Sequence, residues 1–293
     1  MNWHLLWAQI LAGVANGGLY FLVASGLTLL WGALGVVNLA HGSFFMVAAY
    51  AEAICIQTWG PQAGYFVGLV IVPIGVAALG MTFEVTMFRP VYRTGVWGQL
   101  LISFGLVLAL NNATRMIFGV TALSMPPPDF LKGFVEIFGV RLATYQFWIL
   151  GVTTLVAIYL WYLLLHSRTG RLIRAAVDDP QMLEAVGIDV RLLRSVVMGI
   201  AALLAGIAGA VAVPRGAINL EMDTQIVVIA FAVICIGGLG SVWGTLISAM
   251  LIGVAETVST MFVNQGGEIV IFALMVLVLL FKPTGLRTIA GRD

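Results

Sequence analysis

Long runs of apolar residues dominate the sequence, and short segments that carry charge, proline or glycine separate them. A helix needs about 20 mostly apolar residues to cross the hydrocarbon core of a bilayer, and several such runs follow one another here. Hydrophobic residues make up 61% of the chain and charged residues only 9%. A water-soluble fold of this size cannot bury so much apolar surface, so the sequence predicts an all-α, polytopic transmembrane helix bundle.

The apolar runs predict eight or nine spans in a single transmembrane domain over residues 1–293. The expected spans lie near Leu5–Leu30, Val36–Gln57, Gly64–Met87, Val96–Phe118, Phe147–Leu165, Val196–Val213, Ile226–Ile236, Val242–Phe262 and Ile269–Phe281. No Lys or Arg occurs in the first 30 residues, so a cleavable signal peptide is not expected and the first run is interpreted as a span.

The distribution of positive charge predicts the orientation, because Lys and Arg in short loops are retained on the cytoplasmic side. Ten of the 14 such residues fall in three segments, namely Arg89 and Arg93, then Arg168, Arg171, Arg174, Arg191 and Arg194, then Lys282, Arg287 and Arg292. The loops 121–146 and 214–223 then lie outside. With nine crossings, and a cytoplasmic turn at 237–241, the C-terminus is expected in the cytoplasm and the N-terminus outside.

A short capped helix is predicted within the cytoplasmic segment 166–194. Asp179 can cap a helix whose first residue is Pro180, and Gly187 can end it in a left-handed conformation. Two apolar stripes accompany it, namely Met182, Leu183 and Val186 on one face and Ile173, Ala176 and Val177 one or two turns earlier. Such stripes need a cover, which is either the membrane face and its head groups or the groove of a soluble partner.

Three glycines loosen an apolar stretch near the N-terminus, at Gly26, Gly32 and Gly35. Broken backbone within a membrane is tolerated only where protein or water surrounds it. A new helix is expected to begin near Val36, with Asn38, His41 and Phe45 on one face. Its N-terminus would direct N–H groups and positive partial charge at a cavity, which suits a carboxylate.

Polar residues in the spans have more than one interpretation. Asn38 and His41 either line this cavity or hold helices together by hydrogen bonds, and His41 can also serve a proton relay. Glu256 either lines a path or pairs within the bundle, whereas Arg115 is interpreted as structural. Cys55 and Cys235 lie in apolar runs and suggest neither a disulfide nor a metal site.

A glycine-rich segment runs from Ile236 to Gly244 and reads Ile-Gly-Gly-Leu-Gly-Ser-Val-Trp-Gly. It fails as a dinucleotide-binding loop, because no strand or βαβ unit surrounds it. We interpret it as a tight turn that reverses two helices in the membrane or at its inner face.

Three segments together resemble the branched-chain amino-acid permease family of ABC importers, of the LivH type. They are Gly-Val-Val-Asn-Leu-Ala-His-Gly ending at Gly42, Glu-Ala-Val-Gly-Ile from Glu184 to Ile188, and the glycine-rich segment. The first departs from the family pattern at Leu39, where an aromatic residue is frequent. The resemblance covers about residues 26–253.

The resemblance implies a permease subunit in a bacterial inner membrane that works with a second homologous permease, two cytoplasmic ATP-binding subunits and an external solute-binding protein. The substrate class implied is leucine, isoleucine and valine, although related permeases carry other amino acids, short amides, urea or aromatic acids. The residues assigned to ATPase coupling are Asp178, Asp179, Met182, Leu183, Glu184, Ala185, Gly187 and Ile188. Those assigned to the substrate path are Asn38, His41, Gly42, Phe45, Gly237, Gly238 and Glu256.

Other function classes fit the sequence less well. A phosphate-binding loop needs Gly-Lys before Ser or Thr, whereas the two lysines precede Gly133 and Pro283, so ATP would be used by partner subunits and no cofactor is expected on this chain. No motif of an intramembrane enzyme is present, and a net charge of +1 suggests no nucleic-acid partner. The alternative that stays open is an ion-coupled secondary transporter or channel for a small solute such as urea or a short amide.

Overall fold

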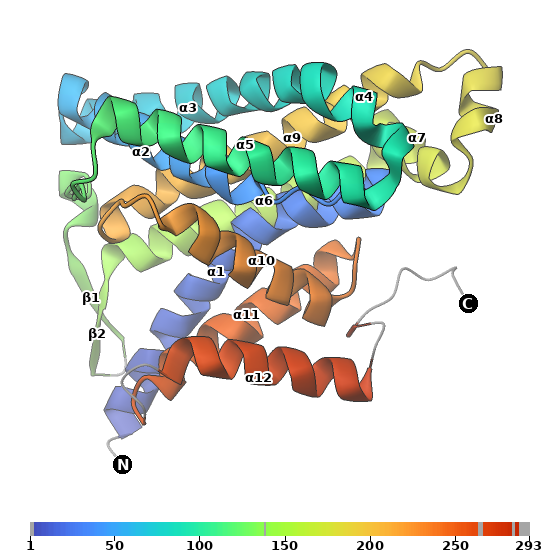
Figure 1. Ribbon diagram of the computed structural model, residues 1–293. Coiled ribbons are helices and arrows are strands. Elements are labelled where there is room, and N and C mark those ends of the chain that lie inside the picture. Colours follow the sequence, from blue (N-terminus) through green and yellow to red (C-terminus); the bar gives the residue numbers. More distant parts are fainter. Residues whose placement is uncertain (1–2, 138, 263–265, 283–284, 287–293) are drawn as a thin grey trace.

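The computed structural model describes residues 3–137, 139–262, 266–282 and 285–286 as a bundle of long helices (Figure 1). The long helices are α1 (Trp3–Leu34), α2 (His41–Trp59), α3 (Pro61–Phe83), α5 (Gly95–Phe118), α6 (Thr144–His166), α9 (Val190–Ala212), α10 (Met222–Gly237), α11 (Val242–Ser259) and α12 (Gly266–Phe281). Each matches one expected span, so the predicted all-α transmembrane bundle is confirmed. Six helical stretches of the described chain are long and apolar enough to cross a bilayer, while Met222–Gly237 and Ile269–Phe281 are apolar but shorter.

Shorter elements connect these helices. They are the π-helix η1 (Glu84–Phe88), α4 (Arg89–Val91), the 3₁₀ helices η2 (Tyr92–Thr94), η3 (Asp129–Leu131) and η4 (Val213–Arg215), and the helices α7 (Arg168–Asp178) and α8 (Pro180–Ala185). The expected outer loop 121–146 also contains an antiparallel hairpin of β1 (Phe134–Ile137) and β2 (Val140–Ala143), in which Phe134 pairs with Ala143. The sequence analysis did not predict this hairpin.

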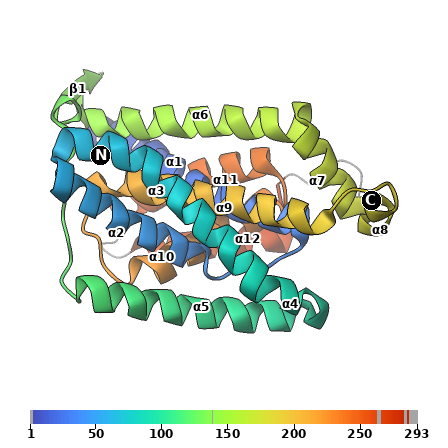
Figure 2. The ribbon, with the colours of Figure 1, turned by 90° about the horizontal axis from the view of Figure 1, so that it is seen from above.

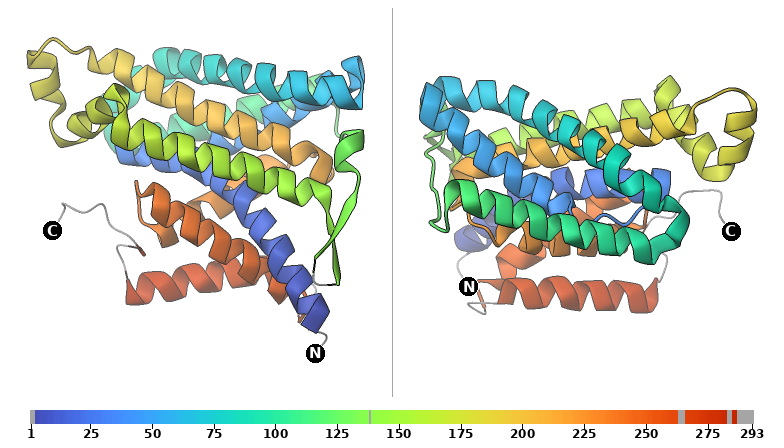
Figure 3. Two further views of the ribbon diagram at one scale, coloured as in Figure 1. Left: turned by 180° about the vertical axis from the view of Figure 1, so that it is seen from behind. Right: turned by 45° about the horizontal axis from the view of Figure 1, so that its top comes forward.

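The connections gather at two opposite ends of the bundle (Figure 1). One, here named the α8 end, holds α7 and α8, the 84–94 connection and the 238–241 turn. The other, the hairpin end, holds β1 and β2, the α2–α3 turn and the 213–221 connection. In both views of Figure 3, α7 and α8 extend beyond the other helices.

Positive charge is divided unequally between the two ends. The α8 end holds Arg89, Arg93, Arg168, Arg171, Arg174, Arg191, Arg194 and Lys282, whereas the hairpin end holds Arg115, Lys132, Arg141 and Arg215. Arg287 and Arg292 lie outside the described residues. The loops expected in the cytoplasm and the loops expected outside therefore lie at opposite ends of the bundle, as the predicted spans require.

Helices α1, α2 and α9 hold most of the buried side chains, α3 packs against α9 and α2 at the edge of the bundle, and α5 and α6 lie on opposite sides (Figure 2). Glycines permit the closest approaches: a Cβ atom at Gly13 would lie 2.6 Å from the Cα of Val254, so α1 and α11 touch through their backbones. Small residues at such positions gain dispersion contacts that lipid cannot replace.

The chain breaks later than the sequence predicted. Helix α1 runs unbroken through Gly26 and Gly32, and the break occurs at Gly35, whose φ is +61°. Residues 35–40 are not helical, and α2 begins at His41 rather than near Val36. The two earlier glycines serve close packing, because a Cβ atom at Gly26 would lie 2.7 Å from the Ala201 carbonyl oxygen.

Candidate functional site

Helix α8 is short and has a defined cap at each end. The Asp179 side chain accepts hydrogen bonds from the backbone N–H groups of Gln181 (2.9 Å) and Met182 (3.0 Å), and Pro180 is the first helical residue. Both features match the sequence prediction. Because the cap satisfies N–H groups that the helix itself leaves unpaired, a helix of only six residues keeps a defined shape.

The C-terminus of α8 is closed by a Schellman motif. The N–H of Ile188 donates to the Leu183 carbonyl (3.1 Å) and that of Gly187 to the Glu184 carbonyl (3.0 Å). Gly187 has a φ of +84°, a conformation that glycine adopts without the steric cost that a Cβ atom brings. Helix α9 follows directly, with Asp189 as its N-cap: the Asp189 side chain accepts the backbone N–H groups of Arg191 and Leu192.

The exposed surface of α8 differs in one residue from the predicted stripe. Met182 and Val186 are each 67% exposed, whereas Leu183 is only 7% exposed. Residues four apart share a face and residues one apart do not, so Leu183 turns toward the protein. The exposed pair therefore consists of Met182 and Val186, and Glu184 and Ala185 are exposed beside it.

A continuous cluster of buried apolar side chains connects this loop to the break between α1 and α2. It includes Ile173 of α7, Leu193, Val197, Met198 and Ala201 of α9, and Val36, Ala40 and Phe44 around the start of α2. Closely packed protein interiors have low compressibility and transmit strain. Helix α9 thus connects the loop that holds α8 to the segment in which Asn38 and His41 lie.

The break itself is buried and internally hydrogen-bonded. Asn38 is fully buried, and its Oδ1 accepts the N–H of Ala40 (3.0 Å). The ring Nε2 of the fully buried His41 lies 2.9 Å from the Val23 carbonyl oxygen of α1. Because a carbonyl only accepts, Nε2 carries a proton, and Nδ1 has no hydrogen-bond partner among the described residues.

A buried acidic residue faces the first turn of α2. Asp223 of α10 is 2% exposed, and its Oδ2 accepts from Ser43 (3.3 Å) and from Asn111 of α5 (3.2 Å). Asn111 also donates to the Leu220 carbonyl (2.7 Å). The helix dipole favours a negative charge at this place, so the protein's own carboxyl group lies where the sequence analysis expected a ligand's.

Among the other residues predicted for the substrate path, Phe45 lies one turn after His41 on α2, and the rest lie at separate places. Phe45 is buried, with its backbone against Gly209 of α9. Gly237 packs against Gly244 of α11, and Gly238 begins the predicted tight turn with a φ of +97°.

Glu256 bonds to α1 rather than to α2. Its Oε2 accepts the Tyr20 hydroxyl (2.5 Å), and the neighbouring Thr257 accepts from Asn16 (3.3 Å). These contacts fasten α11 to α1. The structure thus brings Asn38, His41 and Gly42 together, but it places Gly237, Gly238 and Glu256 elsewhere.

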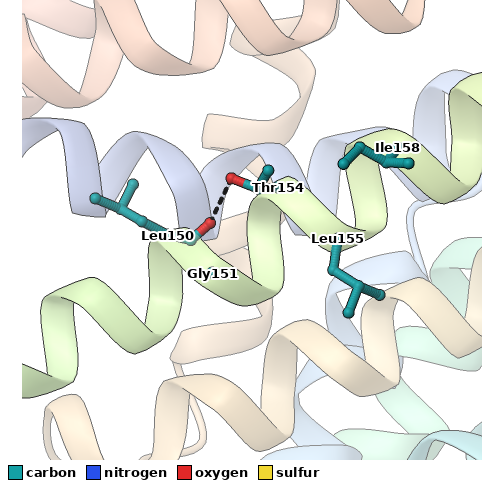
Figure 4. Close-up of a pocket in the computed structure, with 5 residues that line it drawn as sticks. All are labelled: Leu150, Gly151, Thr154, Leu155 and Ile158. Carbon is teal, nitrogen blue, oxygen red and sulfur yellow. Dashed lines mark hydrogen bonds between the residues drawn. The ribbon is translucent and has the colours of Figure 1, made fainter.

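Two hollows on the described surface lie away from the start of α2. One is a shallow apolar groove along α6, lined by Leu150, Gly151, Thr154, Leu155 and Ile158, where Thr154 bonds its own helix (Figure 4). The other lies at the hairpin end, between Asn16, Tyr145, Gln146 and Arg215. Neither contains a residue predicted for the substrate path.

Sequence analysis missed three buried acidic residues. Asp223 was assigned to an outer loop, whereas Glu52 and Glu84 were not singled out although each is fully buried. The available signal was an acidic residue inside an apolar run, which is rare and usually functional or paired.

Comparison with known proteins gives one consistent result. The family model described as the permease component of branched-chain amino acid transport systems matches residues 9–279. The high-affinity branched-chain amino acid transport system permease protein LivH of Escherichia coli strain K12 is 30% identical over 95% of this chain and 94% of its own length.

Two further relatives have related names. The permease protein BraD of Pseudomonas aeruginosa is 30% identical over 95% of this chain and 94% of its own length. The permease protein LivM of Escherichia coli strain K12 is 25% identical over 92% of this chain and 67% of its own length.

Proposed function

Because the chain belongs to the permease-component family of branched-chain amino acid transport systems, we propose that it is one membrane-spanning subunit of an ABC importer for branched-chain amino acids. It has no catalytic activity and binds no cofactor of its own. Separate ATPase subunits supply the energy, since neither lysine of the chain stands in a phosphate-binding loop. The chain forms a single permease domain, with the coupling loop at 166–194.

The α8 end faces the cytoplasm of a bacterial inner membrane in this proposal. Eight of the 14 Lys and Arg residues lie at this end, and positive residues are retained on the cytoplasmic side. The C-terminus is then cytoplasmic, and the hairpin end faces the external solute-binding protein.

Helix α8 is the contact for an ATPase subunit. The observation that carries this assignment is the short helix capped at both ends, with Met182 exposed on it and Val186 exposed at its C-cap. An apolar pair on a rigid helix fits a groove in a soluble partner at low entropic cost. Asp178, Asp179, Glu184, Ala185, Gly187 and Ile188 shape or flank this contact.

The movement reaches the substrate path through α9. ATP-driven closure of the ATPase subunits displaces α8, and α9 carries the displacement to Asn38 and His41 through the buried apolar cluster. Substrate passes near the start of α2, where Gly42 and Phe45 also lie. A second, homologous permease completes the path, in keeping with the match of this chain to proteins named LivH and LivM.

The test is leucine uptake by the assembled complex in proteoliposomes, with hydrolysis of ATP measured in the same samples. We expect uptake only with ATP, and we expect the double variant Glu184→Ala, Gly187→Ala to lower the leucine taken up per ATP by about tenfold, a change of the size that coupling residues contribute. Gly119→Ala is the matched control, since Gly119 also has a positive φ (+78°) but lies at the hairpin end.

Two results would contradict the proposal. Uptake driven by an ion gradient without ATP would favour the secondary transporter or channel. Equal leucine uptake per ATP in the double variant and in Gly119→Ala would show that α8 does not couple ATP hydrolysis to transport.

A further inference from the structure

A partly buried polar cluster at the α8 end joins the π-helix η1 to the first turns of α9. Glu84 of η1 is fully buried, and its Oε2 accepts from the Ser195 hydroxyl of α9 and from Arg89 Nη2 (3.2 Å). The same Arg89 Nη2 donates to the Ser195 oxygen (2.8 Å). We name Glu84, Arg89 and Ser195 the inner latch.

Stability alone is a weak reason for such a group. The Glu84 side chain is fully buried, whereas that of Arg89 is 34% exposed. Burying a charged group carries a desolvation penalty that can exceed its attraction to a partner charge. Glu84 lies on a π-helix, a rare conformation that is frequent at functional sites. Ser195 lies at the position where α9 leaves the coupling loop, six residues after the cap Asp189.

Several polar groups in the latch and beside it lack hydrogen-bond partners. Glu84 Oε1 and Arg89 Nε of the latch, and the hydroxyl of the neighbouring Tyr92, are buried and have no hydrogen bond among the described residues. Burial, and next the charge of Glu84, raises the pKa of Tyr92 above its ordinary value, so its hydroxyl stays a neutral donor. Arg194 of α9 lies over the Tyr92 ring at 5.0 Å. A second pairing pattern can therefore form from the same groups.

Helix α3 is packed so that it must follow α9. A Cβ atom at Gly206 of α9 would lie 2.7 Å from the Cα of Pro73, and one at Gly80 would lie 2.5 Å from the Cβ of Ala202. On its other face α3 contacts α2, where Gly64 meets the backbone of Ile56. The latch thus lies at the start of a second route from α8 to α2.

We infer that Glu84, Arg89 and Ser195 are positioning residues of the transport cycle, which hold α9 to the end of α3 and exchange hydrogen-bond partners when α8 moves. Helix α3 then moves together with α9, and both shift α2. This inference rests on the proposed function and adds the residues that couple the movement of α3 to that of α9.

The experiment uses the complete transporter in proteoliposomes, with radiolabelled leucine on the binding protein as the probe. Glu84→Gln and Ser195→Ala are expected to lower leucine uptake per ATP by about tenfold while the rate of ATP hydrolysis stays within about twofold. Ser195→Thr, which keeps the hydroxyl group, should restore the wild-type ratio. Asp129→Asn is the matched control, because it removes the exposed ion pair with Lys132 (2.6 Å) at the hairpin end.

The outcomes separate the two proposals. A wild-type complex without ATP-driven uptake would overturn the proposed function and this inference with it. An active wild type whose Glu84→Gln and Ser195→Ala variants keep the normal ratio, including a parallel fall of uptake and hydrolysis, would overturn the inference alone. If Glu84→Gln fails to assemble, Ser195→Ala decides by the same criterion.

Discussion

Gly42 illustrates how single residues determine the packing around the start of α2. A Cβ atom there would meet the backbone carbonyl oxygen of Asp223 and lie 3.0 Å from the Cβ of Val227. Backbone cannot move aside as a flexible side chain can. Helices α2 and α10 can approach this closely only because residue 42 has no side chain.

Gly42→Ala is therefore expected to lower the free energy of unfolding by about 1–3 kcal/mol through overpacking. Gly151→Ala on α6 is the control, because nothing lies within 4 Å of its Cβ position, and alanine there should be neutral or stabilise by up to about 1 kcal/mol. Thermal unfolding of the two purified variants in the same detergent measures the difference. Equal midpoints would show that the approach of α2 to Asp223 does not constrain residue 42.

Helix α8 is the element whose sequence signals are most local. Asp179, Pro180 and Gly187 act on the backbone within a few residues, so its start, its first residue and its end were all predictable. The break after α1 was not, because Gly26 and Gly32 face Ala201 and Gly240, partners far along the chain. The residues next to a glycine do not indicate whether it forms a turn or a close helix contact. The pairing of Asp223 with Asn111 could not be predicted either, because the two residues are distant in the sequence.

Asp179→Ala should weaken α8 by about 1 kcal/mol, the usual effect of losing an N-cap. We expect faster hydrogen exchange at the amides of Gln181 and Met182, together with a lower leucine uptake per ATP. Ser241→Ala is the control, since Ser241 caps α11 through the Gly244 N–H (3.1 Å). If Ser241→Ala lowered leucine uptake per ATP by a similar amount, the loss of any helix cap would disturb coupling, and the cap of α8 would have no special role.

The whole molecule has a division of charge and of connections between two ends, which follows from the span pattern and the positions of Lys and Arg. The composition and the apolar runs were enough to predict the fold class. The routes by which displacement of α8 reaches α2, through α9 and α3, depend on contacts between distant segments, such as Ser195 with Glu84. No pattern in the sequence predicts these contacts. The proposed mechanism requires α8 to lie in the cytoplasm and to bind an ATPase subunit.

Crosslinking of a Met182→Cys variant in cells that contain the full transporter tests that requirement most directly, because Met182 is 67% exposed on α8. A membrane-impermeant thiol reagent should label residue 182 in inside-out vesicles from cells that lack the ATPase subunits, but not in intact cells. With the ATPase subunits present, a short bifunctional reagent should join residue 182 to one of them. Labelling of residue 182 from outside intact cells would contradict the account.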